Sequence, residues 1–331
     1  MGLLRFAAFL IVIPLLVGGC ARRDSTTTIN SAKPAALRKI VLQTDWFPQA
    51  EHGGYYQALA KGYYAEAGID VDIWSGGPGA GIKLKVVRGD ADFGMMRSDD
   101  LILAAGVGMP VMIVSATMQH DAQGLMMHDS SPVTTFKDLD GRTVIGNVGM
   151  AYFPYLEKKF GITIQRRQNT YGIGEFLANP ETVQQCLITS EPFFAAQNGR
   201  KVRTLALSES GYDCYQMVFT RRELVRTSPD VVRGFVQASI RGWRDYLEND
   251  PAPANALILK RNPQMTQQLI DFSRGELIRL GFVRGDAAKG EGIGQISIER
   301  LEDEMKTLLS LGILEKPVAI PTIATTEYCR P

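Results

Sequence analysis

Apolar and polar residues alternate along this chain with two different periods. Short apolar runs such as residues 40–42 and 111–114 are typical of buried strands, and apolar residues at helical spacing follow them. Strand and helix patterns that succeed one another from residue 40 to about residue 220 predict an α/β fold. The expected strands span 39–44, 69–74, 92–96, 111–117, 143–146, 185–189, 202–206 and 214–220. The expected helices of this part span 52–61, 78–88, 98–105, 151–159, 172–178 and 190–197.

The last third of the chain reads as mostly helical. Ser228 and Pro229 supply an N-cap and a first-turn proline, and Asn262-Pro263 repeats that signal. Ser297 caps a third segment, which Gly312 ends. We therefore expect helices over 229–248, 263–279 and 297–311, with their apolar stripes in the core.

The amino terminus has the pattern of an export signal. A short positive start is followed by apolar residues 6–17 and by the small residues before Cys20. The apolar run is shorter than the roughly 20 residues that a membrane-spanning helix needs. Val17-Gly18-Gly19-Cys20 resembles a bacterial lipobox, which predicts a signal peptide over 1–19, acylation of Cys20 and a flexible tether over 20–37. The alternative is an ordinary secretory signal with a chance cysteine.

Composition narrows the class of protein further. A chain of 331 residues with 45% hydrophobic and 21% charged residues is typical of globular proteins, and its length favours two lobes at about 150 residues per domain. A net charge of +1 without a basic stripe argues against a nucleic-acid partner. The cysteines beyond Cys20 are Cys186, Cys214 and Cys329, an odd number without any CxxC spacing, so we expect no metal site and at most one disulfide.

An aromatic loop after the first strand is the first candidate site. Trp46, His52 and Tyr55 follow strand 39–44, and ligands of open α/β sheets sit at the carboxyl ends of strands. Flat rings with polar edges suit a small planar molecule. Alternatively, Trp46 and Tyr55 are packing residues and His52 satisfies backbone groups.

The glycine-rich segment 76–81 and the segment around residue 97 supply further candidates. The glycines fit neither a dinucleotide fingerprint nor a phosphate loop, so Gly77 is expected either to present helix N–H groups to a ligand or to make only a turn. Arg97 and Ser98 end strand 92–96 and face the same side, although Arg97 suits a surface ion pair equally well.

Three residues of the middle of the chain complete the candidate site. Glu191 begins a helix after strand 185–189, where its carboxylate either complements the helix dipole or accepts hydrogen bonds from a ligand. Asn147 and Tyr152 occupy a strand-to-helix loop that can face a ligand.

Segments 45–64, 86–96 and 189–194 resemble the solute-binding proteins that deliver thiamine pyrimidine precursors. Their wider superfamily also takes up nitrate, alkanesulfonates, taurine and riboflavin. The resemblance implies a type II periplasmic-binding-protein fold: two α/β lobes, 38–120 plus 217–331 and 121–216, joined by two crossovers around a ligand cleft. We place those crossovers near 118–125 and 211–218.

The resemblance also implies a function. It describes a monomeric lipoprotein of the cell envelope, held on the periplasmic side of a bacterial membrane, which gives a small heteroaromatic solute to an ABC permease and its ATPase. No catalytic motif is visible, so we expect a binding protein without a cofactor rather than an enzyme. The alternatives are a sulfonate, taurine, nitrate or riboflavin type of binding protein, and, from another class, a pyrimidine-synthase-like enzyme or a ligand sensor.

Overall fold

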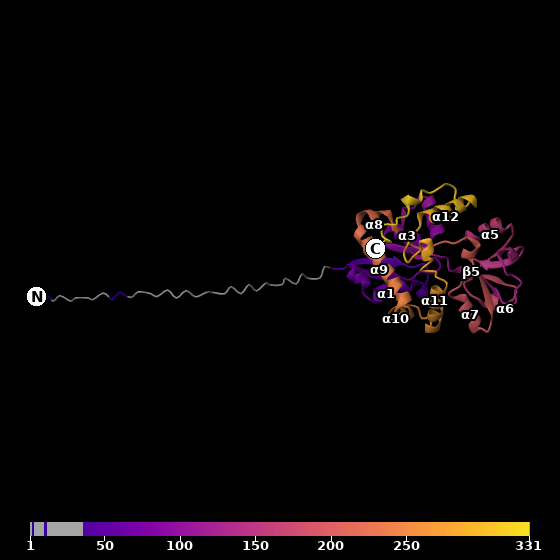
Figure 1. Ribbon diagram of the computed structural model, residues 1–331, viewed down its shortest axis with the longest axis horizontal. Coiled ribbons are helices and arrows are strands. Elements are labelled where there is room, and N and C mark those ends of the chain that lie inside the picture. The colour runs from indigo at the N-terminus through magenta and orange to yellow at the C-terminus, as the bar shows by residue number, and fades with distance from the viewer. Residues whose placement is uncertain (1, 3–9, 12–35, 331) are drawn as a thin grey trace. The chain divides into compact units, whose positions relative to one another are not determined.

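Two five-stranded sheets form the centres of two lobes (Figure 1). The computed structural model describes residues 2, 10, 11 and 36–330, and residues from 36 onward form one unit. Cys20 and almost all of the expected signal peptide and tether therefore lie outside the described residues. The two-lobed α/β fold class predicted from the sequence is confirmed.

The first lobe is built on the sheet β2-β1-β3-β10-β4. β1 pairs in parallel with β2 and β3, whereas β10 is antiparallel to β3 and β4. The strands are β1 (Arg38–Gln43), β2 (Ile69–Trp74), β3 (Phe93–Arg97), β4 (Val111–Met118) and β10 (Gln216–Arg221).

The second lobe is built on the sheet β7-β6-β8-β5-β9. Its strands are β5 (Gln123–His128), β6 (Thr143–Gly146), β7 (Gln165–Gln168), β8 (Val183–Leu187) and β9 (Val202–Ala206). The chain passes from one sheet to the other between β4 and β5 and returns between β9 and β10. The first passage is short because β5 already begins at Gln123, within the segment expected to be a crossover.

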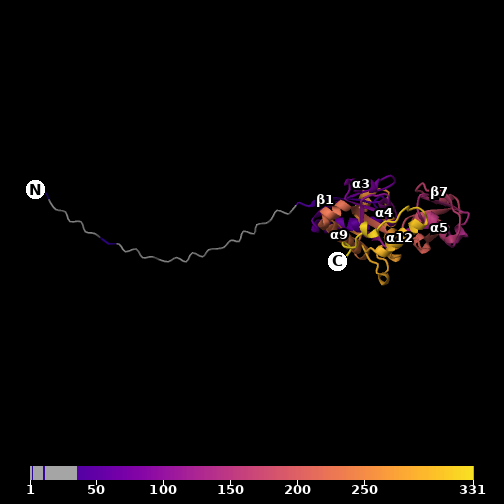
Figure 2. The same ribbon diagram turned by 90° about the horizontal axis from the view of Figure 1, so that it is seen from above.

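Helices surround both sheets. In the second lobe α5, α6 and α7 lie beside β5 at the right of Figure 1, and Figure 2 shows α5 next to β7 from above. Those three helices are α5 (Tyr152–Phe160), α6 (Gly174–Ala178) and α7 (Glu191–Gln197). The first lobe carries α1 (Gly53–Ala60), α2 (Tyr63–Glu66), α3 (Ile82–Arg88), α4 (Ser98–Gly106), α8 (Arg222–Thr227), α9 (Pro229–Glu248), α10 (Ala252–Arg261), α11 (Gln267–Arg279) and α12 (Ile298–Ser310). Short 3-10 turns are η1 (Ala50–His52), η2 (Phe136–Leu139), η3 (Leu207–Ser210), η4 (Ala287–Lys289) and η5 (Ile320–Thr322).

The close approach of α1 and α9 fixes one face of the first lobe. A Cβ on Gly54 would stand 2.1 Å from the ring of Trp243, and one on Gly242 would stand 2.2 Å from the Gly54 carbonyl oxygen. Only glycine fits at such a contact. Phe235 of α9 then stacks on Phe93 of β3 with ring centroids 4.0 Å apart, which joins the helix to the sheet.

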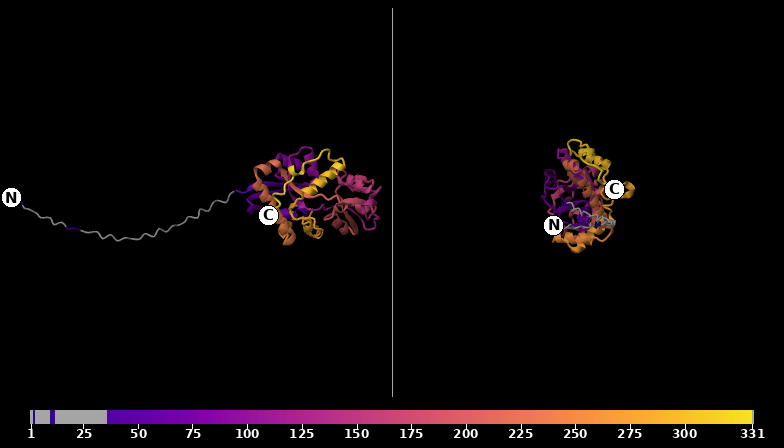
Figure 3. Two further views of the ribbon diagram at one scale, coloured as in Figure 1. Left: turned by 45° about the horizontal axis from the view of Figure 1, so that its top comes forward. Right: turned by 90° about the vertical axis from the view of Figure 1, so that its left-hand side faces the viewer.

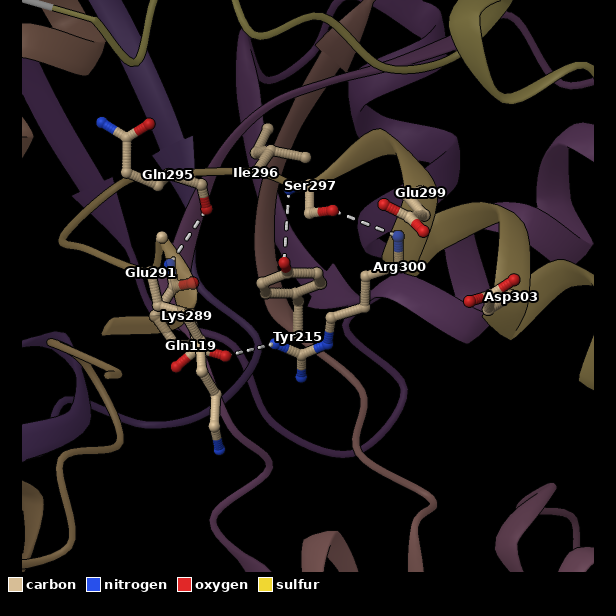
Figure 4. A pocket seen from close by; sticks show the side chains of 11 residues that line it. Gln119, Tyr215, Lys289, Glu291, Gln295, Ile296, Ser297, Glu299, Arg300 and Asp303 are labelled. Carbon is tan, nitrogen blue, oxygen red and sulfur yellow. Dashed lines mark hydrogen bonds and ion pairs between the residues drawn. The ribbon is translucent and has the colours of Figure 1, made fainter. Parts of the chain in front are cut away.

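The carboxyl-terminal segment ties the first lobe to both passages between the lobes. α12 reaches α5, where Lys158 donates a hydrogen bond to the Ser310 carbonyl, and Figure 3 shows this yellow segment crossing toward the second lobe. A pocket of about 260 Å³ lies against α12 and the passages, with Gln119, Tyr215 and Arg300 in its wall (Figure 4).

A cluster of four charged side chains stands beside this small pocket. His120 of the first passage lies between the carboxylates of Asp213, 2.6 Å from Nδ1, and Glu291, 3.0 Å from Nε2. Arg300 contacts the same carboxylates at 3.0 and 3.5 Å. The hydrogen bond with Asp213 and the charge of Glu291 raise the pKa of His120 above its ordinary value. The cluster therefore holds both passages against the first lobe.

Candidate ligand-binding cleft

A cleft of about 580 Å³ lies between the two lobes, within the range of small-molecule sites. Residues after β1 and β2 and residues of the 262–269 segment line it from the first lobe. Residues of β5 and β8 and of the loops after β6, β7 and β8 line it from the second. The cleft thus draws on the carboxyl ends of parallel strands in both sheets, where ligands of such sheets bind.

Aromatic rings from both lobes meet at this cleft. Trp46 of the first lobe and Tyr171 of the second have ring centroids 5.3 Å apart at an angle of 46°. Tyr171 has φ of 62°, and it alone among the described residues other than glycine has positive φ. The backbone N–H of Tyr171 donates a hydrogen bond to Asn169 Oδ1 at 2.7 Å. This contact stabilises the costly backbone conformation of Tyr171. Phe47 and Phe194 also line the cleft.

Asp45 brings a carboxylate into the cleft. His52 Nε2 donates to its Oδ1 at 2.8 Å, and Gln216 Nε2 donates to its Oδ2 at 2.7 Å. Each carboxylate oxygen keeps acceptor capacity for a ligand. His52 is buried and does not line the cleft, so its role in the structure is to hold Asp45.

Glu191 brings a second carboxyl group from the start of α7. The Leu187 backbone N–H donates to its Oε2 at 2.7 Å, which anchors the side chain to the end of β8. Burial raises the pKa of Glu191 to about 7, against the lowering effect of that hydrogen bond. The group therefore changes protonation near neutral pH.

The lobes also contact each other beside the cleft. The Thr189 hydroxyl of the second lobe donates to buried Glu51 of the first. The Ser273 hydroxyl of α11 donates to the Thr189 carbonyl at 2.6 Å, and Phe193 packs on Phe272 with ring centroids 5.5 Å apart. The structure therefore shows lobes in direct contact rather than apart.

The structure brings together three of the predicted residues, since Trp46, Asn147 and Glu191 all line the cleft. Tyr55 does not reach it. Its side chain is buried in the first lobe, where the hydroxyl lies 2.5 Å from Thr117 Oγ1 and the ring packs on Phe235.

Gly77 and Tyr152 lie behind the lining rather than in it. A Cβ on Gly77 would stand 2.9 Å from the Phe47 ring, so this glycine makes room for a residue of the cleft. The buried hydroxyl of Tyr152 donates to Gln185, which does line the cleft.

Arg97 and Ser98 belong to a buried polar group between the lobes. Arg97 pairs with Asp99 at 3.2 Å and with Asp121, so it makes neither of the contacts expected of it, a ligand or a surface ion pair. Ser98 donates to Glu304 at 2.8 Å. Asp99, Cys214 and Glu304 place possible metal-ligand atoms within 4.8 Å of one another, but the Asp99 and Glu304 carboxylates are already paired with these neighbours.

Sequence reasoning missed Asp45 and most of the amides of the cleft. The predicted site residues do not include Asp45, although a carboxylate after a parallel strand is a signal that points to this edge. Gln185 could have been found as the polar first residue of the expected strand 185–189, whereas Gln123 opens β5, a strand that was not predicted. Asn262, Gln264 and Met265 carried no such signal, because a helix was expected to begin at residue 263 and α11 begins only at Gln267.

Comparison with known proteins places the chain in a family. The profile described as "NMT1/THI5 like" matches residues 49–254, more than half of the chain. The chain belongs to the NMT1/THI5-like family. Among the described residues, none of the helices combines the length and apolar character that a membrane crossing requires.

Curated relatives of this NMT1/THI5-like chain include binding proteins and enzymes. It is 25% identical to the riboflavin-binding protein RibY of Chloroflexus aurantiacus over 98% of this chain and 97% of that protein. It is 23% identical to the formylaminopyrimidine-binding protein of Halalkalibacterium halodurans over 89% of this chain and 92% of that one. A 4-amino-5-hydroxymethyl-2-methylpyrimidine phosphate synthase of Legionella pneumophila is 24% identical over 70% of this chain and 76% of its own.

A solved structure shows the same fold. The periplasmic sulfonate-binding protein SsuA of Methylobacillus flagellatus superposes with a TM-score of 0.63 at 12% identity, covering 89% of this chain and 93% of that one. The predicted type II periplasmic-binding-protein fold is therefore confirmed for this member of the NMT1/THI5-like family.

Proposed function

We propose that this protein is the solute-binding component of an ABC importer and that it captures a flat, uncharged or weakly basic nitrogen heterocycle. The observation that carries the proposal is the chemistry of the cleft. Its lining combines four aromatic rings, seven side-chain amides and two carboxyl groups. Among the described residues that form it, none is lysine, arginine or histidine.

This lining disfavours an anionic solute. A sulfonate or nitrate bound there would meet the carboxylate of Asp45 and the partly ionised carboxyl group of Glu191 without a cation to pair with. A planar heterocycle instead uses the rings for stacking and the amides and carboxyl groups for hydrogen bonds. The relatives named for riboflavin and for formylaminopyrimidine support this class of solute, and a thiamine-precursor pyrimidine is our first choice within it.

Solute capture follows from the two-lobed plan. A solute that contacts Trp46 on one side and Asn147 and Glu191 on the other binds best when the lobes are close, so it shifts the population toward closure. An affinity of about 1 μM corresponds to roughly −8 kcal/mol. Stacking contributes about 0.5–1.5 kcal/mol per ring pair, so hydrogen bonds and burial must supply the larger share. The closed pair of lobes is then what the permease recognises.

Cys20 is proposed as the attachment point to the envelope membrane. The lipobox-like sequence supports acylation there, and residues 20–37 would serve as the tether to a periplasmic, monomeric binding protein of lobes 38–120 plus 217–331 and 121–216. Labelled palmitate should enter the wild-type chain and not the Cys20→Ser variant. Equal labelling of both chains would refute the anchor.

Calorimetry on the purified full chain tests the choice of solute. Riboflavin, formylaminopyrimidine, taurine and nitrate are titrated separately, and native mass spectrometry of gently purified protein identifies any solute that has stayed bound. We expect a heterocycle to bind in the micromolar range and the two anions not to bind. Tight taurine binding with no response to either heterocycle would overturn the proposal.

A pair of tryptophan variants connects binding to the cleft. Trp46→Ala should weaken the heterocycle about twofold to tenfold, because it removes the stacking of the ring that faces Tyr171, worth about 0.5–1.5 kcal/mol. Trp74→Ala is the matched control, since Trp74 lies on the edge strand β2 and outside the cleft lining. Equal losses of affinity in both variants would show that the heterocycle does not bind in this cleft.

An enzyme on the same fold is the second candidate, and the pyrimidine phosphate synthases among the relatives favour it. The position of His52 argues against a catalytic role for this residue at the cleft, because its side chain is buried against Asp45 and is absent from the cleft lining. Incubation of the purified protein with the same heterocycles and mass spectrometry of the mixture separates the candidates. Reversible binding without a new product supports the binding protein, whereas turnover supports the enzyme.

A further inference from the structure

Gln185 of β8 has an orientation that its neighbours determine completely. The backbone N–H of Asn147 lies 2.7 Å from Oε1 of Gln185, and the Tyr152 hydroxyl lies 3.3 Å from the same atom. A backbone N–H can only donate, so the side-chain atom that it meets has to be the carbonyl oxygen. The other end of the Gln185 amide is therefore the NH₂ group.

This orientation passes to Gln123 on the neighbouring strand β5. Gln185 Nε2 lies 2.6 Å from Oε1 of Gln123. If the Gln123 amide were turned over, two NH₂ groups would face each other at that distance, which is repulsive. Gln123 therefore keeps its oxygen toward Gln185, and its own Nε2 has no hydrogen-bond partner among the described residues.

Asn147 is oriented in the same sense. Its Oδ1 accepts the backbone N–H of Gly149 at 3.4 Å, which leaves its NH₂ group without a partner among the described residues. Gln123 and Asn147 both line the cleft from the second lobe. Gln123 and Asn147 of that lobe therefore offer N–H donors, while Asp45 across the cleft and Glu191 of the same lobe offer acceptors.

We propose that Gln185 is a positioning residue that turns the amide NH₂ group of Gln123 toward the solute, beside the NH₂ group of Asn147, so that this pair of amides selects a ring carbonyl oxygen. The inference rests on the proposed function and deepens it. The solute class narrows to a planar heterocycle that carries a carbonyl on one edge and an N–H for the carboxyl groups. Such a solute ranks ahead of the thiamine-precursor pyrimidine within the proposed class, because the pyrimidine of the synthase relatives carries a 4-amino group and no ring carbonyl. An amino group in place of the carbonyl would set donor against donor and leave the amide donors unpaired once the solute covers them.

Two bicyclic probes with one ring skeleton test the selection. Pteridine-2,4-dione carries carbonyls where 2,4-diaminopteridine carries amino groups, and both are titrated into the full chain by calorimetry at pH 7. We expect the dione to bind on the order of tenfold to a hundredfold more tightly, the ratio that an unpaired buried donor gives. Tighter binding of the diamine would overturn the inference. Equal affinities would overturn it and leave the proposed function standing, whereas binding of neither probe would overturn both.

Gln185→Glu tests the positioning role. The new carboxylate still accepts from Asn147 and Tyr152 but cannot donate to Gln123, so Gln123 reverses and presents its oxygen to the cleft. The preference for the dione should fall at least tenfold. Gln165→Glu adds the same charge to the second lobe on the exposed edge strand β7, outside the cleft lining, and should leave the preference unchanged. Equal falls in both variants would assign the effect to charge and overturn the positioning role.

A second variant covers the case in which Gln185→Glu does not fold. In Gln123→Glu one carboxylate oxygen still accepts from Gln185 and the other faces the cleft as an acceptor. The preference should then invert toward the diamine. An unchanged preference for the dione in this variant would equally overturn the inference.

Discussion

The carboxyl group of Glu191 makes the stability of the protein depend on pH. Its pKa rises from 4.5 to about 7 on folding, mainly because burial disfavours the charged form. The nearby Glu51 carboxyl contributes a smaller part in the same direction. Each factor of ten in proton affinity corresponds to about 1.4 kcal/mol, so ionising this group costs about 3 kcal/mol more in the folded protein than in the unfolded chain.

The sign follows from proton linkage. A folded-state pKa above the unfolded value means that the native protein binds more protons between pH 4.5 and about pH 7. The contribution of Glu191 to stability is therefore fully present below pH 4.5 and is lost as pH rises to about 7. In Glu191→Gln this loss disappears, while the amide oxygen still accepts from the Leu187 N–H.

Urea denaturation followed by circular dichroism at pH 5 and pH 8 measures the effect. The free energy of unfolding of the wild type should fall by about 2–3 kcal/mol more over this interval than that of Glu191→Gln. Glu209→Gln is the matched control, because Glu209 is an exposed carboxyl group of the second lobe, and its pH dependence should equal that of the wild type. An identical fall in wild type and Glu191→Gln would refute the reasoning.

Three further predictions follow from other contacts. The raised pKa of His120 means that its stabilising effect is complete below pH 6.5 and disappears as pH rises through the raised value, so His120→Asn should flatten the melting temperature between pH 6 and pH 9; an unflattened curve would contradict this. Gly54→Ala forces a Cβ into the tryptophan ring of α9 and should cost at least about 1–3 kcal/mol in urea denaturation, whereas Gly275→Ala, with nothing within 4 Å, should not destabilise. Thr189→Val leaves Glu51 without its donor from the other lobe, so small-angle scattering should show a larger radius of gyration; an unchanged radius would exclude this contact as a clasp between the lobes.

The sequence predicted those elements whose burial leaves a hydrophobic pattern. Helix 229–248 was predicted at the bounds that the structure shows, because a first-turn proline and a long apolar stripe mark it. β7 was missed because its sequence QRRQ is exposed at every position, on an edge of its sheet. β5 was missed because its polar first residue resembled the end of a passage between lobes. Such strands are specified by their neighbours and not by their own pattern.

The candidate site was predictable only in part, for a similar reason. Trp46 and Glu191 follow strands that the hydrophobic pattern locates, so their position at the cleft could be inferred. Tyr55 could not be assigned, since the face of α1 that is buried depends on the contact of Gly54 with α9. The orientation of Gln185 depends on a backbone N–H from another strand's loop, which no spacing along the chain encodes.

The three thiols of the lobes have a consequence for maturation. Cys186, Cys214 and Cys329 are all buried and unpaired, and burial raises the pKa of each, which keeps them in the unreactive protonated form. The lobes as the structure shows them therefore contain no bond that an oxidase or a disulfide isomerase would have to form. The same chain should fold equally well under reducing and oxidising conditions.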